Sequence, residues 1–387
     1  MKRRIIAGIT ALLMAAALPG CGEEYGAAPV RTFRWTAMPL TLERPVLFAQ
    51  EEEPEEEPEE ELHEGQRKSY LTGEWMDEEV AGMRPYAVMI GNTVDALPQY
   101  GLAKADIIYE VPVEGSYTRL MAVFQDPAEA ERIGSIRSCR HYFISFAREF
   151  DAIYAHYGHT VYAQPILDLA EVHNISGMDG SVESVAYYRD KSRKSPHNVF
   201  TTAEGLAAAS EKKGYPTAYH AAYQGHYQFA AADAPQLPAN GIPALVVSPG
   251  YLVNKPWFVY NEADGLYYRY QFKKEHIDGG EEEGNQQLKV KNILIQYCGW
   301  SNMDENGYLD IDTLSGGEGK YITNGRVMDV TWRRENEDSP TRYYDPAGKE
   351  ILLNPGKTWV CIVRDTYKDR FSLYNTQEEL LEARSME

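Results

Sequence analysis

Basic side chains gather in the loops that follow strand-like segments in the first half of the chain. The residues whose types suit anion binding are Arg119, Arg137, Arg140, His156, Arg189, Arg193, Lys194, His197 and Asn198. An arginine guanidinium carries five donors in a planar fork, which binds carboxylate or phosphate in a bidentate manner. The pattern therefore predicts a basic cleft for an anionic ligand. The same arginines could instead form internal ion pairs with acidic residues, and the sequence leaves both interpretations open. The acidic candidates are Asp106, Glu110, Glu114 and Asp190.

Residue types used in nucleophilic and metal chemistry also occur, but in patterns of low specificity. Cys139 stands beside Arg140, and a cationic neighbour lowers the pKa of a thiol, but nothing in the sequence places a base next to it. His156 and His159 are three positions apart and lack the spacing of a zinc motif. We therefore assign no catalytic residue, no metal ligand and no cofactor.

The charge of the chain is negative and unevenly distributed. The 387 residues carry a formal net charge of −20, and ten glutamates lie in the tract 51–64 alone. This balance argues against a nucleic-acid partner, because phosphate backbones are bound by clustered Lys and Arg. The rest of the chain is only mildly acidic, so a local basic cluster there remains able to bind an anion.

The N-terminus has the pattern of a bacterial lipoprotein signal. Three basic residues at positions 2–4 precede an apolar run over 5–18, which is shorter than the ~20 residues of a membrane span. The run leads to Leu18-Pro19-Gly20-Cys21, which matches a lipobox with an unusual Pro19. We expect a signal peptide over 1–20 and diacylglycerol on Cys21, whose two acyl chains suffice for stable anchoring. The predicted location is the outer face of the cytoplasmic membrane.

The remaining chain divides into a tether, two domains and a tail. The segment 21–81 contains the Pro-interrupted glutamate tract and is predicted to be a disordered spacer. Strand-like and helical segments alternate over 82–220, including a helix capped by Thr201 or Thr202 and Gly214. After a connection at 221–240, strand-like segments separated by turns fill 240–375, with Asn-Gly hairpin signals at 306–307 and 324–325. The fold class predicted is α+β: an α/β-type sandwich domain, a mostly antiparallel β domain, and a short helix or tail over 376–387.

Three cysteines remain after Cys21, namely Cys139, Cys298 and Cys361. An odd number leaves at least one thiol without an internal partner. Cys298 and Cys361 lie in apolar strand-like runs, where a small buried side chain is the commoner role. The oxidising compartment still leaves a Cys298–Cys361 disulfide open.

Several runs of the sequence resemble the YerB-like lipoproteins, a bacterial family defined by a two-part domain of unknown function. The matching runs include RPYAVMIGN, QYGLAKADIIYE, EGSYTR, IGSIRSCRHYF and RKSPHNVFT in the first part, and GKYITNGRVMDVTWRR and SPTRYYDPAGKEILLNPGKTW in the second. The resemblance implies a lipoprotein with two domains and implies no reaction. The function expected from the residues is therefore binding of a cell-wall polymer or an envelope protein.

A weaker resemblance offers an alternative function. The run RLMAVFQDPAEAERIGSIRS followed by AHYG is similar to the LytR-CpsA-Psr phosphotransferases, which transfer wall glycopolymers. It would give Arg137, Arg140 and Arg193 phosphate contacts and leave Glu110 or Asp106 to place Mg²⁺. The Arg-Asp pair of that family is replaced here by Arg137-Ser138, which puts the alternative in doubt.

Overall fold

The computed structural model describes residues 63–238, 241–280 and 284–386. The predicted signal peptide, Cys21 and the glutamate tract up to Glu61 lie outside the described residues. Residues 66–81, assigned from the sequence to the tether, are folded: they form a two-stranded sheet and a helical turn, and Leu71 is buried in the core. No helix of the described part is long and apolar enough to cross a membrane.

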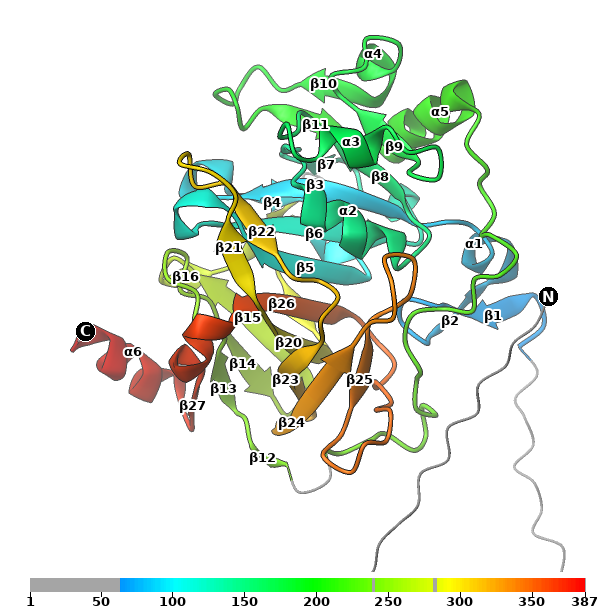
Figure 1. Cartoon of the computed structure of the whole chain (residues 1–387). Coiled ribbons are helices and arrows are strands. Elements are labelled where there is room, and N and C mark those ends of the chain that lie inside the picture. Colours follow the sequence, from blue (N-terminus) through cyan, green and yellow to red (C-terminus); the bar gives the residue numbers. More distant parts are fainter. Residues whose placement is uncertain (1–62, 239–240, 281–283, 387) are drawn as a thin grey trace, which may run out of the picture. The chain divides into compact units, whose positions relative to one another are not determined.

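A mixed sheet of eleven strands carries residues from both halves of the chain (Figure 1). Its strands, in spatial order, are β12 (Ile242–Pro243), β24 (Arg326–Arg333), β23 (Gly317–Thr323), β20 (Asn292–Cys298), β26 (Thr358–Arg364), β5 (Ile107–Pro112), β6 (Thr118–Phe124), β3 (Tyr86–Asn92), β8 (Ile153–His156) and β9 (Asn174–Ser176), with β25 (Arg342–Tyr344) beside β24. The two halves meet where β26 pairs in parallel with β5. The predicted boundaries at 82–220 and 240–375 stay a prediction, and the sheet runs across both segments.

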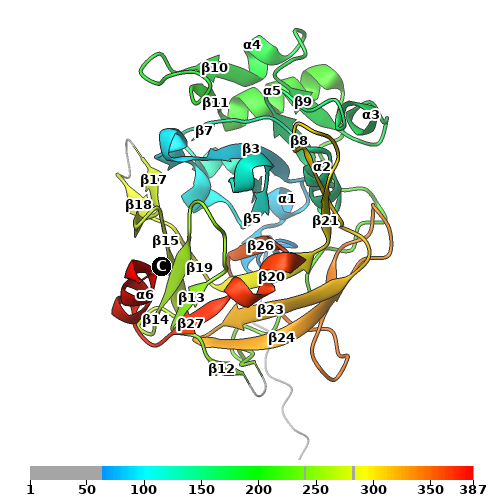
Figure 2. The same ribbon diagram turned by 60° about the vertical axis from the view of Figure 1, so that its left-hand side comes forward.

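Two further sheets and two hairpins complete the strands. One six-stranded sheet contains β10 (Tyr187–Arg189), β11 (Val199–Thr201), β7 (Ile133–Gly134), β4 (Gln99–Tyr100), β17 (Ile277–Gly279) and β18 (Gln286–Gln287). The other contains β16 (Lys274–Glu275), β15 (Leu266–Gln271), β14 (Trp257–Asn261), β13 (Val246–Ser248) and β27 (Ser372–Tyr374), with β19 (Lys289–Val290) beside β15. The hairpins are β1 (Gln66–Lys68) with β2 (Trp75–Asp77), and β21 (Trp300–Asn302) with β22 (Leu309–Ile311). β17 of the second half pairs in parallel with β4 of the first, and Figure 2 shows the β17–β18 hairpin at the left of the view.

The helices are short and lie on the faces and edges of these sheets. They are α1 (Glu78–Ala81), α2 (His141–Arg148), α3 (Gln164–Leu167), α4 (Glu183–Ala186), α5 (Ala203–Lys213) and α6 (Gln377–Ser385). The 3₁₀ turns are η1 (Val94–Ala96), η2 (Leu102–Lys104), η3 (Glu114–Ser116), η4 (Pro127–Glu129) and η5 (Asp365–Arg370). The predicted caps of α5 are confirmed: the Thr202 side chain accepts the Gly205 N–H, and Gly214 is left-handed.

The central strands are buried on both faces because alternate side chains enter two different cores. Met89 and Met121 pack with α2 on one face, while Ile90 and Leu120 pack with α5 on the other.

The predicted hairpins at both Asn-Gly pairs are present, and Asn324 and Gly325 have φ of 48° and 71°, as a primed two-residue turn requires. The predicted α+β class is confirmed. Strand-like patterns did not indicate that β20 pairs with β26 in parallel.

Glu110 on β5 is the centre of a buried polar network between the two halves of the chain. Its side chain is fully buried and its Oε2 accepts from Nη2 of Arg269 at 2.7 Å, whose side chain is 1% exposed. The other partners donate to the same carboxylate: Asn254 at 2.6 Å, Thr118 at 2.9 Å, and Asn92 and Trp359 at 3.3 Å. Every donor is itself buried, so the network is satisfied only when all its strands are in place.

His276 extends this network to β4. Burial, and secondarily the adjacent Arg269, lower the pKa of His276 well below its usual range, so the ring is neutral. Its Nδ1 faces Arg269, which can only donate, and its Nε2 lies 2.9 Å from Oε1 of Gln99. Nδ1 is therefore the acceptor, and Nε2 carries the proton and donates to Gln99.

Replacing Glu110 by Gln should destabilise the fold strongly. The change leaves Arg269 charged, buried and without a carboxylate, which costs about 3–5 kcal/mol of the free energy of unfolding. The matched control is Glu318→Gln, which removes an exposed carboxylate paired with Lys368 and should leave the free energy of unfolding nearly unchanged. Urea unfolding followed by tryptophan fluorescence measures both, and equal losses for the two variants would contradict a central role for Glu110.

Candidate functional site

Arg119 is a buried arginine at the start of β6, next to the Glu110 network. Its residue is 8% exposed and its Nη1 donates to the carbonyl of Ser138. Within the described residues it forms no ion pair with a carboxylate. Burial first, and then the charges of Arg140 and Arg137, lower the pKa of Arg119 to about 9. The guanidinium is therefore held among other cations in an environment that disfavours its charge.

Arg137 lies over Gly91, the residue opposite Arg119 in the β3–β6 pairing. A Cβ at Gly91 would come within 3.0 Å of Cγ of Arg137, so a side chain there would displace the arginine. Nη1 of Arg137 donates to the carbonyl of Pro196 at 3.0 Å. Burial and the charge of Arg140 lower the pKa of Arg137, which also has no ion pair among the residues described.

Arg140 is the one member of this group with an acidic partner. Its Nε and Nη2 donate to Oε1 and Oε2 of Glu114 at 2.8 and 2.7 Å, a bidentate pair. Arg119, Arg137 and Arg140 thus share one carboxylate between three guanidinium groups. We call these three residues the arginine site.

The loop 189–198 lies beside the arginine site and forms the wall of a pocket of about 610 Å³. We call it the loop pocket; it is lined by Asp95, Leu97, Pro98, Tyr100, Arg132, Asp190, Ser192, Arg193, Lys194, Ser195, Pro196 and His197. Burial first, and then the charge of Arg137, lower the pKa of His197; Asp95 opposes this effect, and Arg193 and Arg119 add to it, so His197 lies near cations of both groups. Lys194 is exposed and has no ion pair in the described part of the chain.

The other predicted ligand-binding residues hold the loop. Arg193 donates to the carbonyls of Ala96 and Pro98, both at 2.8 Å. Arg189 donates to the Tyr157 hydroxyl at 3.0 Å and to Oδ1 of Asn198 at 3.1 Å. These contacts fix the shape of the loop pocket and use the donors internally.

His156 lies apart from this surface. It is fully buried, burial lowers its pKa to about 4, and its Nδ1 lies 2.8 Å from the carbonyl of Gly158. The position suits a neutral ring that holds the turn after β8. Its contact with a ligand stays a prediction, and its burial does not favour it.

The carboxylates considered for Mg²⁺ are occupied or buried. Glu110 receives five donors and Glu114 is held by Arg140. Asp106 accepts the Gln125 N–H at 2.7 Å, and burial raises its pKa to about 6. The described ranges contain no group of three His, Cys, Asp or Glu side chains arranged to hold a metal ion.

Cys139 is unsuited to nucleophilic chemistry. It is fully buried, and burial raises the pKa of its thiol to about 12 despite the arginines nearby. Cys298 and Cys361 are also free and buried; they lie on neighbouring strands three positions out of register. The disulfide left open by the sequence is not formed.

The loop-pocket residues that were not predicted from the sequence include Asp95, Tyr100 and Arg132. Arg132 pairs with Asp190 at 3.1 Å and its guanidinium lies 3.8 Å from the centre of the Tyr100 ring. Two features of the sequence point to these residues: the turn-rich segment around Pro98 and the basic residue before Ile133. The spacing alone did not show that these segments face the loop 189–198.

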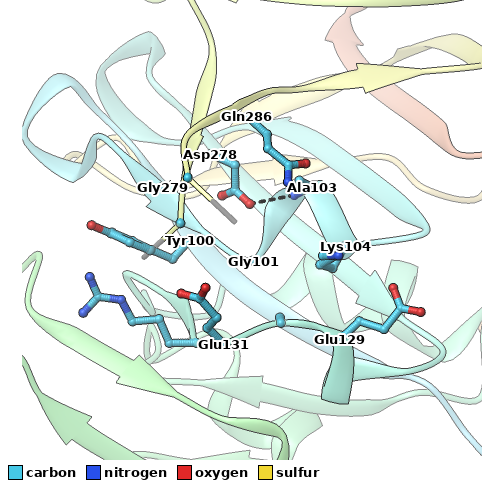
Figure 3. A pocket seen from close by; sticks show the side chains of 13 residues that line it. Tyr100, Gly101, Ala103, Lys104, Glu129, Glu131, Asp278, Gly279 and Gln286 are labelled. Atoms are coloured by element: carbon cyan, nitrogen blue, oxygen red, sulfur yellow. Dashed lines mark hydrogen bonds between the residues drawn. The ribbon is translucent and has the colours of Figure 1, made fainter. Parts of the chain in front are cut away.

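A water-sized hollow of about 30 Å³ lies on the other side of Tyr100 and Arg132. In Figure 3 the carboxylates of Asp278 and Glu131 face each other across it, with Glu129 at its rim. Asp278 accepts the Ala103 N–H at 2.9 Å, and burial raises its pKa to about 7. The lining of this hollow therefore carries both signs of charge, because Lys104 and Arg132 lie in it together with the three carboxylates.

The comparisons with known proteins agree on one relationship. Residues 71–216 match the family "Protein of unknown function (DUF3048) N-terminal domain", and residues 247–360 match its C-terminal domain. The chain is 32% identical over 306 residues to "Putative lipoprotein YerB" of Bacillus subtilis, covering 77% of this chain and 86% of that protein. It also matches the crystal structure of YerB protein from Bacillus subtilis with a TM-score of 0.69 and 30% identity, over 80% of this chain and 100% of the other. The predicted family is confirmed.

Asp278 predicts a pH dependence of stability. Its pKa in the fold, about 7, is above the ordinary value of 3.8, so the native state binds the proton more tightly than the unfolded state. The stability this gives is present below pH ~4 and is lost as pH rises towards 7. The Asp278→Asn variant cannot ionise at this position. Between pH 5 and pH 8 its free energy of unfolding should therefore fall by about 1–3 kcal/mol less than that of the wild type.

Urea unfolding at the two pH values measures this difference. Glu335→Gln, an exposed carboxylate outside the hollow, is the control and should keep the wild-type pH dependence. An unchanged pH dependence in Asp278→Asn would show that Asp278 does not titrate in this range.

Proposed function

This chain belongs to the DUF3048 family, and from that premise we propose that it is a lipid-anchored envelope protein that binds an anionic ligand. The ligand is held by the arginine site and the adjoining loop pocket. The protein acts by binding and does not catalyse a reaction. The observation that supports this proposal most directly is the excess positive charge of the arginine site, in which three guanidinium groups share one carboxylate.

The excess charge of the arginine site favours occupation by an anion. A buried charge is costly unless it is paired, and the pKa of Arg119 is lowered by burial and by two cationic neighbours. Phosphate or carboxylate oxygens would supply the missing counter-charge and accept bidentate donors. Arg119 and Arg137 are held by single carbonyl contacts, so most of their donors remain available to a ligand.

The envelope location rests on the N-terminal pattern and on the relative. The lipobox at Cys21 and the basic residues before the apolar run support lipid attachment. The similar Bacillus subtilis protein is named as a lipoprotein. An anchor at Cys21 followed by the glutamate tract would present the folded part at the outer face of the cytoplasmic membrane, where wall polymers and acidic envelope proteins occur.

The alternative is a Mg²⁺-dependent phosphotransferase or hydrolase. It needs an acidic side chain beside the arginines that is open to a metal ion. Glu110 lies at the centre of a buried network and Glu114 is used by Arg140, so neither is open. This arrangement favours binding over catalysis.

Arg137→Gln should weaken anion binding. Loss of a charge-assisted contact corresponds to about a 10- to 100-fold rise in the Kd for pyrophosphate. The measurement is isothermal titration calorimetry on the full chain in neutral detergent, with unfolding curves to confirm that the variant is folded. Arg333→Gln, an exposed arginine on β24, is the control and should bind as the wild type does. Equal affinity of Arg137→Gln and wild type would contradict the proposed site.

Cys21→Ser should release the protein from the membrane. The variant cannot carry diacylglycerol, so it should move from the membrane fraction to the soluble fraction and fail to incorporate an alkyne-tagged palmitate. Cys139→Ser keeps Cys21 and should remain in the membrane fraction with label. Retention of Cys21→Ser in the membrane fraction would show that anchoring does not depend on this residue.

A further inference from the structure

We propose that the anionic ligand is a linear chain of hydroxylated units joined by phosphodiester groups, bound through two consecutive phosphates. One phosphate lies at the arginine site and the next lies in the loop pocket. This inference rests on the proposed function and adds to it the chemical class of the ligand and the length that is recognised.

Two cationic positions, the arginine site and the loop pocket, adjoin each other. Arg137 belongs to the arginine site and also donates to the carbonyl of Pro196, which lines the loop pocket. His197 is close enough to Arg119, Arg137 and Arg193 for their charges to lower its pKa. A single phosphate held by Arg119 and Arg137 would leave Lys194 in the loop pocket without an anion. A ligand with two anionic groups satisfies both positions.

The loop pocket is the second of these positions. Its volume of about 610 Å³ is within the range of small-ligand sites and accommodates one polyol or sugar unit with its phosphate. Its walls are polar, with the hydroxyls of Ser192, Ser195 and Tyr100 and the carboxylates of Asp95 and Asp190. Asp190 is already used by Arg132 and Ser192, so Asp95 is the carboxylate of this wall that can accept a hydrogen bond from a hydroxyl group and repel a bare anion, which suits a hydroxylated unit between phosphates. An acyl chain would find few apolar side chains here.

The basic surface ends near Tyr100 and Arg132. Beyond Tyr100 and Arg132 lies the hollow lined by Asp278, Glu129 and Glu131 (Figure 3). The lining of that hollow also includes Lys104, but at about 30 Å³ the hollow holds water and is too small for a phosphate unit. The bound stretch is therefore limited to about two phosphates, and a longer chain leaves the pocket into solvent.

The length of the ligand tests this directly. The full chain in neutral detergent is titrated by calorimetry with glycerol 1-phosphate and with synthetic glycerol phosphate oligomers of two, three and six units. The affinity of the protein for one oligomer should rise at least 10-fold between the one-unit and the three-unit ligand. It should rise little further with the six-unit ligand. Linear inorganic polyphosphate of matched charge, which lacks hydroxyl groups, should bind at least 10-fold more weakly than the three-unit oligomer.

Variants of the loop separate the two positions. Lys194→Gln should remove most of the gain from the second unit, because Lys194 belongs to the loop pocket, whereas Arg137→Gln should lower the affinity at every length. Lys191→Gln, an exposed lysine of the same loop that does not line the pocket, is the matched control and should behave as wild type.

Each negative outcome of these titrations contradicts a different part of the proposal. Equal affinity at every length, abolished by Arg137→Gln, would overturn the two-phosphate inference and leave the proposed function standing. Equal binding of polyphosphate would overturn the requirement for hydroxylated units. No binding of any of these anions would overturn the proposed function together with the inference.

Discussion

The structure depends on the buried ion pair of Glu110 and Arg269. A carboxylate in a core is stable only when every lone pair is used, and here the donors come from strands of both halves of the chain. The same network fixes the arginine site. Thr118 donates to Glu110 from one face of β6, so the next residue, Arg119, must leave by the opposite face. Asn92 contacts Glu110 at the end of β3, and the preceding Gly91 provides the bare backbone over which Arg137 lies.

Charge separation underlies the specificity for anions that we propose. The chain as a whole is strongly acidic, but ten of its glutamates are concentrated in the tract 51–64. In the folded part, the carboxylates near the arginine site are already used: Glu110 by the network and Glu114 by Arg140. Arg119 and Arg137 are left as cations held by backbone carbonyls.

The sequence predicted the features that depend on local pattern. The class of fold, the caps of α5 and the Asn-Gly hairpins follow from periodicity and turn chemistry, and the basic loops were identified by residue type. Long-range partners were not predictable. Nothing in the spacing shows that Glu110 meets Arg269, that β26 lies parallel to β5, or that Arg193 spends its donors on the carbonyls of Ala96 and Pro98. Depth of burial was equally hidden, and it removes Cys139 as a nucleophile and sets the neutral state of His156.

The most direct measurement is a crystal structure of the chain with a two-unit glycerol phosphate bound. The surplus of guanidinium groups predicts one phosphate within hydrogen-bonding distance of both Arg119 and Arg137, with Arg140 still paired to Glu114. The contrary result is a ligand bound elsewhere while Arg119 and Arg137 keep only their contacts to Ser138 and Pro196, which would show that the surplus charge serves the fold and not a ligand.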